Sequence, residues 1–414
     1  MSQIRKRLKA EYRALANPRQ LNRFMDGNGS LANRGEIAEL YQYDWHARKL
    51  KFETHFRGLI LLQATAYRST RDYQWAAEND PLYLACGAGV EISVAGLAQA
   101  NRDRPLGPML ELAQQVLTEV RNLPQRRLRA LDKETWQGIV RLLQQTDLID
   151  ALTVELPPRL EKWAKGKKEG TSALKLQLRM DGWDGSFKKI MLTPEPGVDT
   201  PYLPYLLSDL SQLQDQIFVF DGGYWKIAYY HAIADSQNWF VTKLNKRIKP
   251  LTVEKLPLPQ QPLASEYTIL SDDLIYLGDR QDILYRRLEV IQTQGKQITL
   301  LTNLIHLSAD QICLLYRYRW TIEIVFRWLQ QTLELDHMMS HSPTGIVRQI
   351  LLTLILWGLL VIFNQNPSKL SPKLLWRQLY ADLHHSLLEF GFRLGVRSAL
   401  AFSPAYSSIV KKIT

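Results

Sequence analysis

Apolar residues recur at spacings of three and four along most of the first 145 positions, which is the spacing that places them on one side of a helix. The pattern predicts helices over 48–66, 90–99, 108–122 and 133–145. No alternating stretch of strand type interrupts them. We therefore expect an all-helical N-terminal region over residues 1–145.

The pattern changes near residue 147 to short apolar or alternating stretches bounded by turn residues. It predicts strands over 148–154, 174–180, 187–192, 217–220 and 239–244, and helices over 202–214 and 225–235. Asp184-Gly185 is a hairpin turn between the second and third strands. Hairpins followed by strands that alternate with helices predict a mixed α/β sheet with helices packed on it.

Residues 245–303 change again, to prolines mixed with β-like stretches, and predict a β-rich insertion. Its strands are expected over 267–270, 274–277, 283–291 and 297–301. Ser308 and Gln311 form a capping-box pattern that starts a long helix, 309–335. We place the catalytic domain over 146–345.

The tail, 346–414, is predicted to be a helical region, and it starts with a strongly apolar run over 350–363. At about 14 residues, this run falls short of the roughly 20 that are needed to span a bilayer. We expect it to form a buried helix.

Composition places the chain among ordinary globular proteins, with 46% hydrophobic and 22% charged residues in 414. Two cysteines, Cys86 and Cys313, are too few for a disulfide framework or a cysteine-based zinc site, and we expect free thiols in a reducing cytoplasm. The first residues lack the apolar core of a signal peptide.

The net charge of +11 suggests a polyanionic partner, most often nucleic acid. Residues 1–74 hold 14 basic and 7 acidic side chains, so most of the excess lies there. A merely basic protein would show the same balance, and charge alone does not decide between these interpretations.

One face of the predicted helix 309–335 concentrates polar side chains beside an apolar stripe. At 100° per residue this face collects Tyr316, Arg319, Glu323, Arg327 and Gln330. A surface ladder of salt bridges would give the same spacing. The neighbouring apolar stripe instead places these side chains at the edge of the core.

Two aspartates lie where the predicted sheet makes carboxylates costly unless they are paired. Asp150 is inside the first strand and Asp221 ends the fourth. If these strands are neighbours, the two carboxylates repel each other unless a cation such as Mg²⁺ or Mn²⁺ neutralises them. Glu323 would complete a site for two metal ions. Asp181 and Asp184 are rivals for the first position, and each aspartate alone is also explained as a turn or cap residue.

Here the sequence resembles a known family. Tyr316, Arg319, Glu323 and Gln330, within LYRYRWTIEIVFRWLQQ, resemble the Tyr-Arg-Glu-Lys signature of insertion-sequence transposases of the DDE class. LLTNL, FVFDGGY, FVTKL and LIDALTVELP also look like that family, over roughly residues 85–365. The resemblance implies a ribonuclease-H-like catalytic domain with a β-rich insertion before the last acid.

The resemblance also implies roles for single residues. Asp150, Asp221 and Glu323 would bind two Mg²⁺ or Mn²⁺ ions and catalyse cleavage. Tyr316 and Arg319 would grip a phosphate near the transposon end, and the fork of a guanidinium suits phosphate.

The sequence departs from the family at two positions. Gln330 stands where the family has Lys, and it brings no charge, although Arg327 on the same face would compensate. Gly222 follows the second aspartate where many relatives have Arg.

An aromatic side chain in the insertion is implied to stack on a flipped base at the DNA end. Tyr267, Tyr276 and Tyr285 are the candidates, and the sequence does not choose between them. Trp320, beside Arg319, matches a recurrent family tryptophan and is a further DNA-binding candidate, although a packing role explains it equally well.

The sequence thus predicts a DNA transposase that cleaves transposon ends, frees a 3′-hydroxyl and transfers it into target DNA in association with the nucleoid. The basic N-terminal region would bind the terminal inverted repeats, mainly through phosphates. A homodimer would hold the paired ends. Two alternatives remain: a catalytically impaired transposase-derived DNA-binding protein, and a structure-specific DNA nuclease.

Overall fold

A computed structural model describes most of the chain. The described residues are 33–64, 67–123, 139–194, 197–258, 267–331, 333, 335 and 337–363. The basic residues 1–32, the start of the predicted helix 133–145 and the tail after 363 lie outside the described residues.

The chain forms two compact units. One comprises the chain up to Pro124 together with the chain from Trp328 onward, and the other is Gln125–Arg327. The boundary between the two units falls within helix α14 (Trp320–Gln331). Residues 328–345, which we had placed with the catalytic region, are thus grouped with the helical unit.

The described part of the first unit is helical. Its helices are α3 (Arg34–Leu40), α4 (Phe52–Ala64), α5 (Thr70–Asn79), α6 (Pro81–Ala85), α7 (Val94–Asp103), α8 (Gly107–Asn122) and α15 (Pro343–Phe363). Three of the predicted helices are found as α4, α7 and α8. Helices α3, α5 and α6 were not predicted. Helices α3 and α6, with 7 and 5 residues, carry too few turns for a clear apolar period.

Helix α15 is the core of this unit. It is long and apolar enough to cross a membrane, but 94% of its apolar window is buried within the protein, as in the core helix of a globular unit. It packs on α4, α7 and α8. At Gly358 a Cβ atom would lie 2.2 Å from Cγ1 of Val116 on α8, so only glycine allows this close approach. The helix is longer than the 14-residue run that we predicted, because it starts at Pro343.

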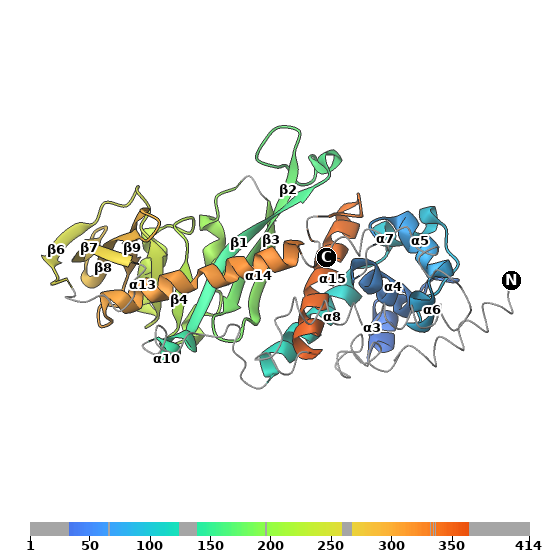
Figure 1. Ribbon diagram of the computed structural model, residues 1–414, viewed down its shortest axis with the longest axis horizontal. Coiled ribbons are helices and arrows are strands. Elements are labelled where there is room, and N and C mark those ends of the chain that lie inside the picture. Colours follow the sequence, from blue (N-terminus) through green and yellow to red (C-terminus); the bar gives the residue numbers. More distant parts are fainter. Residues whose placement is uncertain are drawn as a thin grey trace. The chain divides into compact units, whose positions relative to one another are not determined.

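The second unit is built on one nine-stranded mixed sheet in the order β3-β2-β1-β4-β5-β9-β8-β7-β6 (Figure 1). The strands are β1 (Thr146–Leu156), β2 (Ser172–Asp181), β3 (Phe187–Pro194), β4 (Ile217–Phe220), β5 (Trp239–Lys243), β6 (Leu251–Lys255), β7 (Tyr267–Leu277), β8 (Arg280–Gln292) and β9 (Gln297–Thr302).

Strand β1 pairs antiparallel with β2 and parallel with β4, and β4 pairs parallel with β5. Three antiparallel strands followed by two parallel ones form a ribonuclease-H-like sheet, and the predicted fold class is confirmed. The insertion continues the sheet through β9, β8, β7 and β6.

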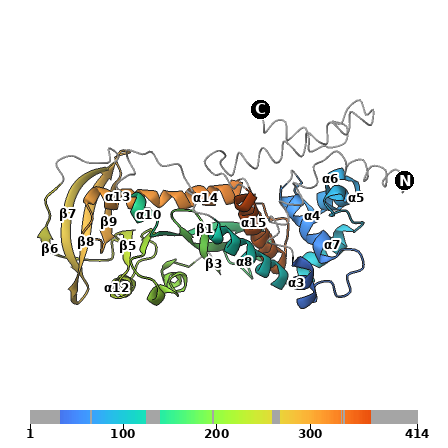
Figure 2. The same cartoon turned by 90° about the horizontal axis from the view of Figure 1, so that it is seen from below.

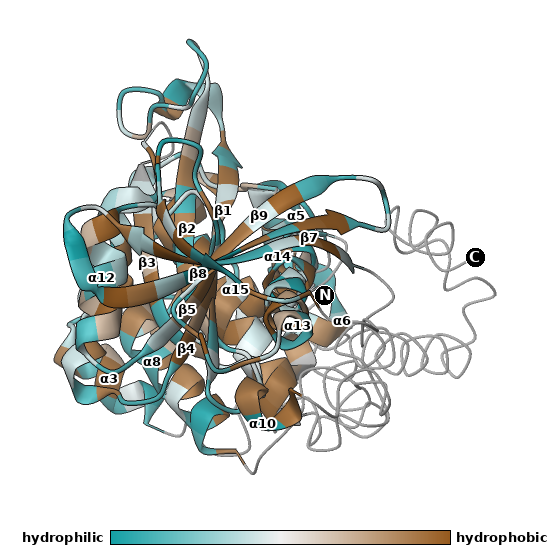
Figure 3. Cartoon of the chain, turned by 90° about the vertical axis from the view of Figure 1, so that its left-hand side faces the viewer, coloured by the Kyte–Doolittle hydropathy of each residue, from teal (hydrophilic) through white to brown (hydrophobic). Residues whose placement is uncertain are grey.

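Helices cover both faces of the sheet. Helix α12 (Ile227–Asp235) and helix α13 (Ala309–Tyr318) lie on opposite faces (Figures 2 and 3). Phe218 and Phe220 of β4 belong to the buried cluster under α12 and α11 (Leu203–Leu206). Because side chains alternate along a strand, the neighbouring positions face α13 and α14.

Two predicted helices differ from the structure. The helix expected over 202–214 is a series of short turns, of which α11 is the only α-helical one among the described residues. The helix expected over 309–335 begins with the predicted capping box at Ser308, but it divides at Arg319 into α13 and α14. The N–H of Arg319 bonds the carbonyl of Tyr316, three residues back, which tightens the backbone there.

Candidate active site

Asp150 and Asp221 extend from neighbouring parallel strands at the same edge of the sheet. The register pairs Ile149 with Phe220, the residues directly before the two aspartates. Paired strands lie about 4.8 Å apart. The condition that we set from the sequence, that the strands of the two acids be neighbours, is therefore met.

Arg319 joins two of the predicted acids. Its Nη1 donates to Oδ2 of Asp150 over 2.7 Å, and its Nη2 donates to Oε1 of Glu323 over 2.5 Å. The side chain of Arg319 is 13% exposed, that of Asp150 17% and that of Glu323 30%. One guanidinium thus lies between a strand acid and a helix acid in a half-closed site.

The negative charge of this site exceeds what one guanidinium neutralises. Burial, together with the charges of Asp221 and Glu323, raises the pKa of Asp150 to about 7, against the opposing effects of Arg319 and the N–H of Ala151. Burial works against the charge of Arg319 as well, but Asp150 and its other neighbours raise its pKa above the ordinary value. Three carboxylates therefore share one fixed cation.

Asp221 is held by the turn that follows it. Its Oδ1 accepts the N–H of Gly223 over 2.7 Å, and its backbone carbonyl accepts the hydroxyl of Thr242 from β5 over 3.1 Å. A Cβ at position 223 would lie 2.8 Å from that Oδ1, so glycine is required for the bond. The carboxylate of Asp221 is thereby fixed at the edge of the sheet.

The other predicted residues of this helix surround the acids to different extents. The ring of Tyr316 lies under the guanidinium of Arg319, 5.8 Å from its carbon, and burial raises the Tyr316 pKa to about 12. Trp320 is 50% exposed, and Arg327 is exposed one turn after Glu323. Gln330 is half-buried on α14 and is grouped with the other unit.

The donor set fits a hard divalent ion, because carboxylate oxygens are the ligands that Mg²⁺ and Mn²⁺ prefer. Within the described ranges, however, no three acidic, histidine or cysteine side chains are gathered closely enough to coordinate one ion. Arg319 accounts for this separation, since its guanidinium stands between Asp150 and Glu323. The three acids therefore offer the ligand atoms of a metal site, while the guanidinium of Arg319 stands between two of them.

The rival acids Asp181 and Asp184 lie elsewhere. Asp181 is opposite Asp147 in the β1–β2 register, whereas Asp150 is opposite Leu178. Lys188 bonds Asp181 over 3.0 Å and Asp147 over 2.6 Å. The side chains of Asp181 and Asp184 thus belong to a different cluster. Of the three aspartates considered for the first position, only Asp150 lies beside Asp221.

A group of cations escaped the sequence analysis. They lie at the end of β5 or in the segments after β4 and β5, at the edge that carries Asp221: Lys226, Lys243, Lys246, Arg247 and Lys249. Within the part of the chain that the structure describes, none of them forms an ion pair. The guanidinium of Arg247 lies 5.2 Å from the ring centre of Trp225, and the ammonium of Lys226 lies 5.3 Å from that of Tyr229. The sequence KLNKRIKP signals positive charge but not its position beside an acid.

The tyrosines proposed for base stacking are mostly inaccessible. Tyr267 is 6% exposed, and Tyr285 is fully buried with its hydroxyl 2.7 Å from Nδ1 of His231. Tyr276 is half-buried. Because Tyr267 and Tyr285 are buried, neither ring is accessible for stacking on a base in this conformation.

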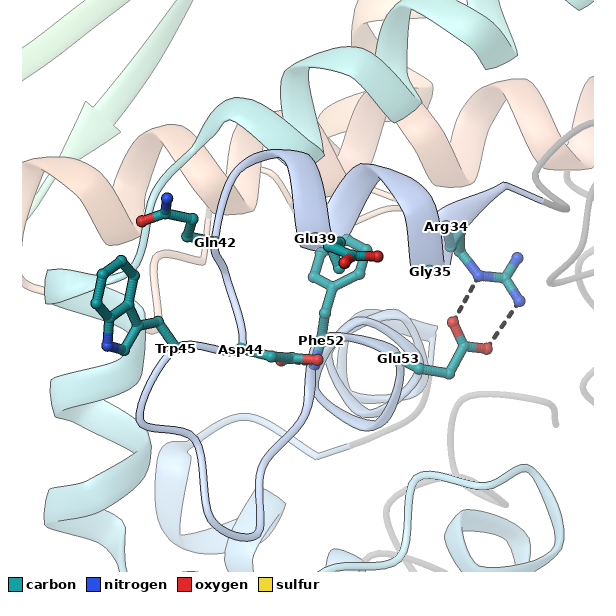
Figure 4. Close-up of a pocket in the computed structure, with 9 residues that line it drawn as sticks. Arg34, Gly35, Glu39, Gln42, Asp44, Trp45, Phe52 and Glu53 are labelled. Carbon is teal, nitrogen blue, oxygen red and sulfur yellow. Dashed lines mark hydrogen bonds and ion pairs between the residues drawn. The ribbon is translucent and has the colours of Figure 1, made fainter.

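The helical unit has a hollow of its own, of 860 Å³, beside α3 (Figure 4). Arg34 at its rim is bonded through Nε and Nη2 to both carboxylate oxygens of Glu53, at 2.7 and 2.8 Å. Trp45, 63% exposed, lies on its other side. Arg34 and Glu53 are thus paired with each other, and Asp44 accepts the N–H of Phe52 over 2.6 Å.

The fold and these acids define a class. A sheet of this order, with aspartates at the ends of two adjacent parallel strands and a glutamate on the covering helix, is a ribonuclease-H-like domain with an acidic site.

The comparison with protein families identifies the family to which this domain belongs. The family described as "Transposase DDE domain" matches residues 144–359, which is more than half of the chain. The protein belongs to this family of insertion-sequence DDE transposases. The match extends from β1 through both acids and α14 to near the end of α15.

Curated relatives agree with the family. A Sinorhizobium fredii protein named as transposase y4zB is 31% identical over 151 residues, which cover 35% of this chain and 42% of that protein. A Geobacillus stearothermophilus protein named as a transposase for insertion sequence element IS5377 is 23% identical over 189 residues, or 45% and 49% of the two chains. The chain thus spans less than half the length of either relative.

Among solved structures, the piggyBac transposase in a synaptic complex with hairpin DNA aligns at a TM-score of 0.44 and 12% identity. That alignment covers 94% of this chain and 84% of the other.

Proposed function

We propose that the protein cuts DNA at the ends of its own element by metal-dependent hydrolysis, frees a 3′-hydroxyl, and joins that hydroxyl to target DNA. The observation that carries this proposal is the placement of Asp150 beside Asp221, with Glu323 tied to Asp150 through Arg319. Membership of the DDE transposase family supports it.

Asp150, Asp221 and Glu323 would hold two Mg²⁺ or Mn²⁺ ions. When bound, such ions activate water and stabilise the leaving oxygen in phosphodiester hydrolysis. The protein contributes more carboxylates than cations at this edge of the sheet, and their positions are fixed by the strands. Because burial raises the pKa of Asp150 to about 7, a further cation would favour its ionised form.

Arg319 and Tyr316 would position the phosphate. Arg319 stands between the acids, so its fork would bind a phosphate oxygen that enters next to them. The ring of Tyr316 supports the guanidinium from below. Trp320 and Arg327 are exposed beside them for further DNA contacts, and Gln330 would add a hydrogen bond without charge.

The cations after β4 and β5 would hold the backbone on the Asp221 side of the site. Arg247 and Lys226 are supported by aromatic rings rather than by carboxylates, so their charge remains available to phosphates. They also supply positive charge next to Gly222, whose Cβ position lies 3.0 Å from the carbonyl of Lys243. This crowding disfavours a larger side chain at position 222.

The remaining parts of the proposal concern the assembly. The basic N-terminal region would bind the terminal inverted repeats, and the C-terminal helices would join two copies into a homodimer on paired ends. Each copy would supply one acidic site, because two ends require two cuts.

A cleavage assay tests the proposal. Purified protein is incubated with Mg²⁺ and a labelled duplex that carries the element's own terminus, beside the variants Asp221→Ala and Glu323→Gln. We expect the wild type to cut at the terminus and both variants to fail while they still bind the duplex.

Two outcomes would contradict the proposal. Tight binding without cutting by any of the three proteins would indicate a catalytically impaired DNA-binding protein, with Gln330→Lys as the variant to restore cleavage. Cutting of branched or unrelated duplexes at equal rates would indicate a structure-specific nuclease.

A further inference from the structure

Strand β1 does not stop at the acidic edge. Its pairing with β4 ends at Ile149, but β1 continues beside β2 as far as Leu156. Six residues beyond Asp150 at about 3.3 Å each carry the hairpin roughly 20 Å past the site. Figures 1 and 3 show this arm projecting from the rest of the sheet.

The end of the arm is a folded structure, which we name the hairpin knob (residues 157–171). The N–H of Gly166 donates to the carbonyl of Thr171 over 2.8 Å, and the hydroxyl of Ser172 donates to that of Pro158 over 3.1 Å. Leu160 and Ala164 are buried inside it. Side chains on the surface of the knob are therefore held in place relative to the acids.

The surface of the knob is positive. It carries five cations, Arg159, Lys162, Lys165, Lys167 and Lys168, against two acids, Glu161 and Glu169. The carboxylate of Glu161 accepts a hydrogen bond from the N–H of Gly170, at 3.2 Å. No ion pair is formed by Arg159, Lys162, Lys165 or Lys168 with any described residue.

Trp163 stands among these cations with 41% of its surface exposed. Cations around an exposed aromatic ring form a combination that contacts nucleic acid, through charge to phosphate and through the flat face of the ring.

We propose that the hairpin knob binds the phosphate backbone of the duplex being cut, about 20 Å from the scissile phosphate. This inference rests on the proposed function, because the acidic edge fixes where the scissile phosphate lies. At 3.4 Å per base pair, 20 Å corresponds to roughly six base pairs. Lysine contacts to phosphate carry no sequence preference, so the knob fixes orientation rather than recognising a sequence.

Salt dependence of binding tests the knob. The variant with Lys162→Ala, Lys165→Ala and Lys168→Ala is compared with one that carries arginine at the same three positions. Each neutralised phosphate contributes about 0.9 to the slope of log affinity against log salt. We expect the alanine variant to lose between two and three units of slope and the arginine variant to keep the wild-type slope.

Cross-linking locates the contact. Cys86 and Cys313 are buried, so a Lys165→Cys variant accepts a photo-cross-linker selectively at the knob. We expect adducts to DNA within about six base pairs of the scissile bond. Adducts confined to a second protein chain, or an unchanged salt slope in the alanine variant, would overturn the inference.

The same experiments separate this inference from the proposed function. If the wild type binds and cuts the terminus while the alanine variant shows an unchanged slope and the wild-type melting temperature, only the knob is wrong. If the wild type neither binds nor cuts the terminus, the proposed function fails and the knob inference fails with it.

Discussion

Two charged clusters lie three residues apart on β1 and differ in almost every respect. Because three is odd, Asp147 and Asp150 face opposite sides of the sheet. Asp147 is fully buried and bonds Arg179 and Lys188, each over 2.6 Å. Asp150 is 17% exposed and shares Arg319 with Glu323 while it also faces Asp221.

The difference lies in the balance of charge. In the Asp147 cluster, Arg179 also bonds Asp209 over 2.6 Å, and its guanidinium lies 5.0 Å from the ring centre of Phe218. Lys188 also bonds Asp181 over 3.0 Å, so three carboxylates share two cations there, and each carboxylate is bonded to a cation. At the edge, three carboxylates lie beside one guanidinium, which bonds only Asp150 and Glu323. We call the first cluster balanced because all its carboxylates are bonded to cations. A cluster with an unbonded carboxylate is instead prepared to bind a further cation.

The largest effect on stability is expected at the balanced cluster. Burial raises the pKa of Asp147 as well, against the opposing charges of Lys188 and Arg179. Asp147→Asn would nevertheless leave these two cations without their shared buried carboxylate, and breaking such a pair costs about 3 to 5 kcal/mol. Urea denaturation at pH 7.5 should show this loss in the free energy of unfolding. A change below about 1 kcal/mol would mean that the two clusters do not differ as we describe.

A smaller effect is expected when the edge loses its internal cation. Arg319→Gln leaves the three acids unneutralised, so we expect Mg²⁺ to bind roughly tenfold more tightly, or by about 1.4 kcal/mol. Thermal shifts at increasing Mg²⁺ concentration report this affinity without DNA. Arg327→Gln, which removes an exposed cation one turn beyond Glu323, is the matched control and should leave the Mg²⁺ response near that of the wild type.

The smallest effect concerns a cluster with the opposite imbalance, in the helical unit. Burial works against the charge of Glu53, but Arg34 and then Arg57 hold its pKa below the ordinary value. Its stabilising contribution is therefore present at neutral pH and is lost as the pH falls through the lowered pKa. Because Glu53 is 43% exposed, we expect Glu53→Gln to cost less than about 1 kcal/mol at pH 7. The cost should vanish near pH 2, and a cost that persists there would refute the ionic origin.

Much of the sheet could be predicted from the sequence because its strands are short apolar runs between clear turns. Strand β4 matches the expected 217–220, and the turn at Asp184-Gly185 is found, with Gly185 at a φ of +76°. The pairing of β1 with β4 entered the sequence analysis only as a condition, because periodicity along the chain does not show which strands are neighbours. Strand β6 was missed because all five of its residues are exposed, so it carries no buried period.

The site could be predicted only in part. Spacing along one helix placed Arg319 and Glu323 on a common face, and their bond is present. No spacing could reveal that Arg319 also reaches Asp150, 169 residues away, since that contact depends on how α14 crosses the sheet. The hairpin knob escaped for a related reason. Its lysines can be read in the sequence, but their position beyond the acidic edge follows from the length of β1 relative to β4.

The central claim is that Asp150 serves chemistry whereas Asp147 serves the fold, and Asp150→Asn tests it most directly. The pKa of Asp150 is raised to about 7 in the folded protein, so its ionisation lowers the stability as the pH rises from about 4 to about 7, and the full cost is present above that range. At pH 8, we therefore predict that the metal-free variant unfolds with the wild-type free energy or a higher one. Its Mg²⁺-dependent cleavage of the terminal duplex should fall by roughly 1,000-fold. Retained cleavage, or a loss of stability as large as that of Asp147→Asn, would contradict the account.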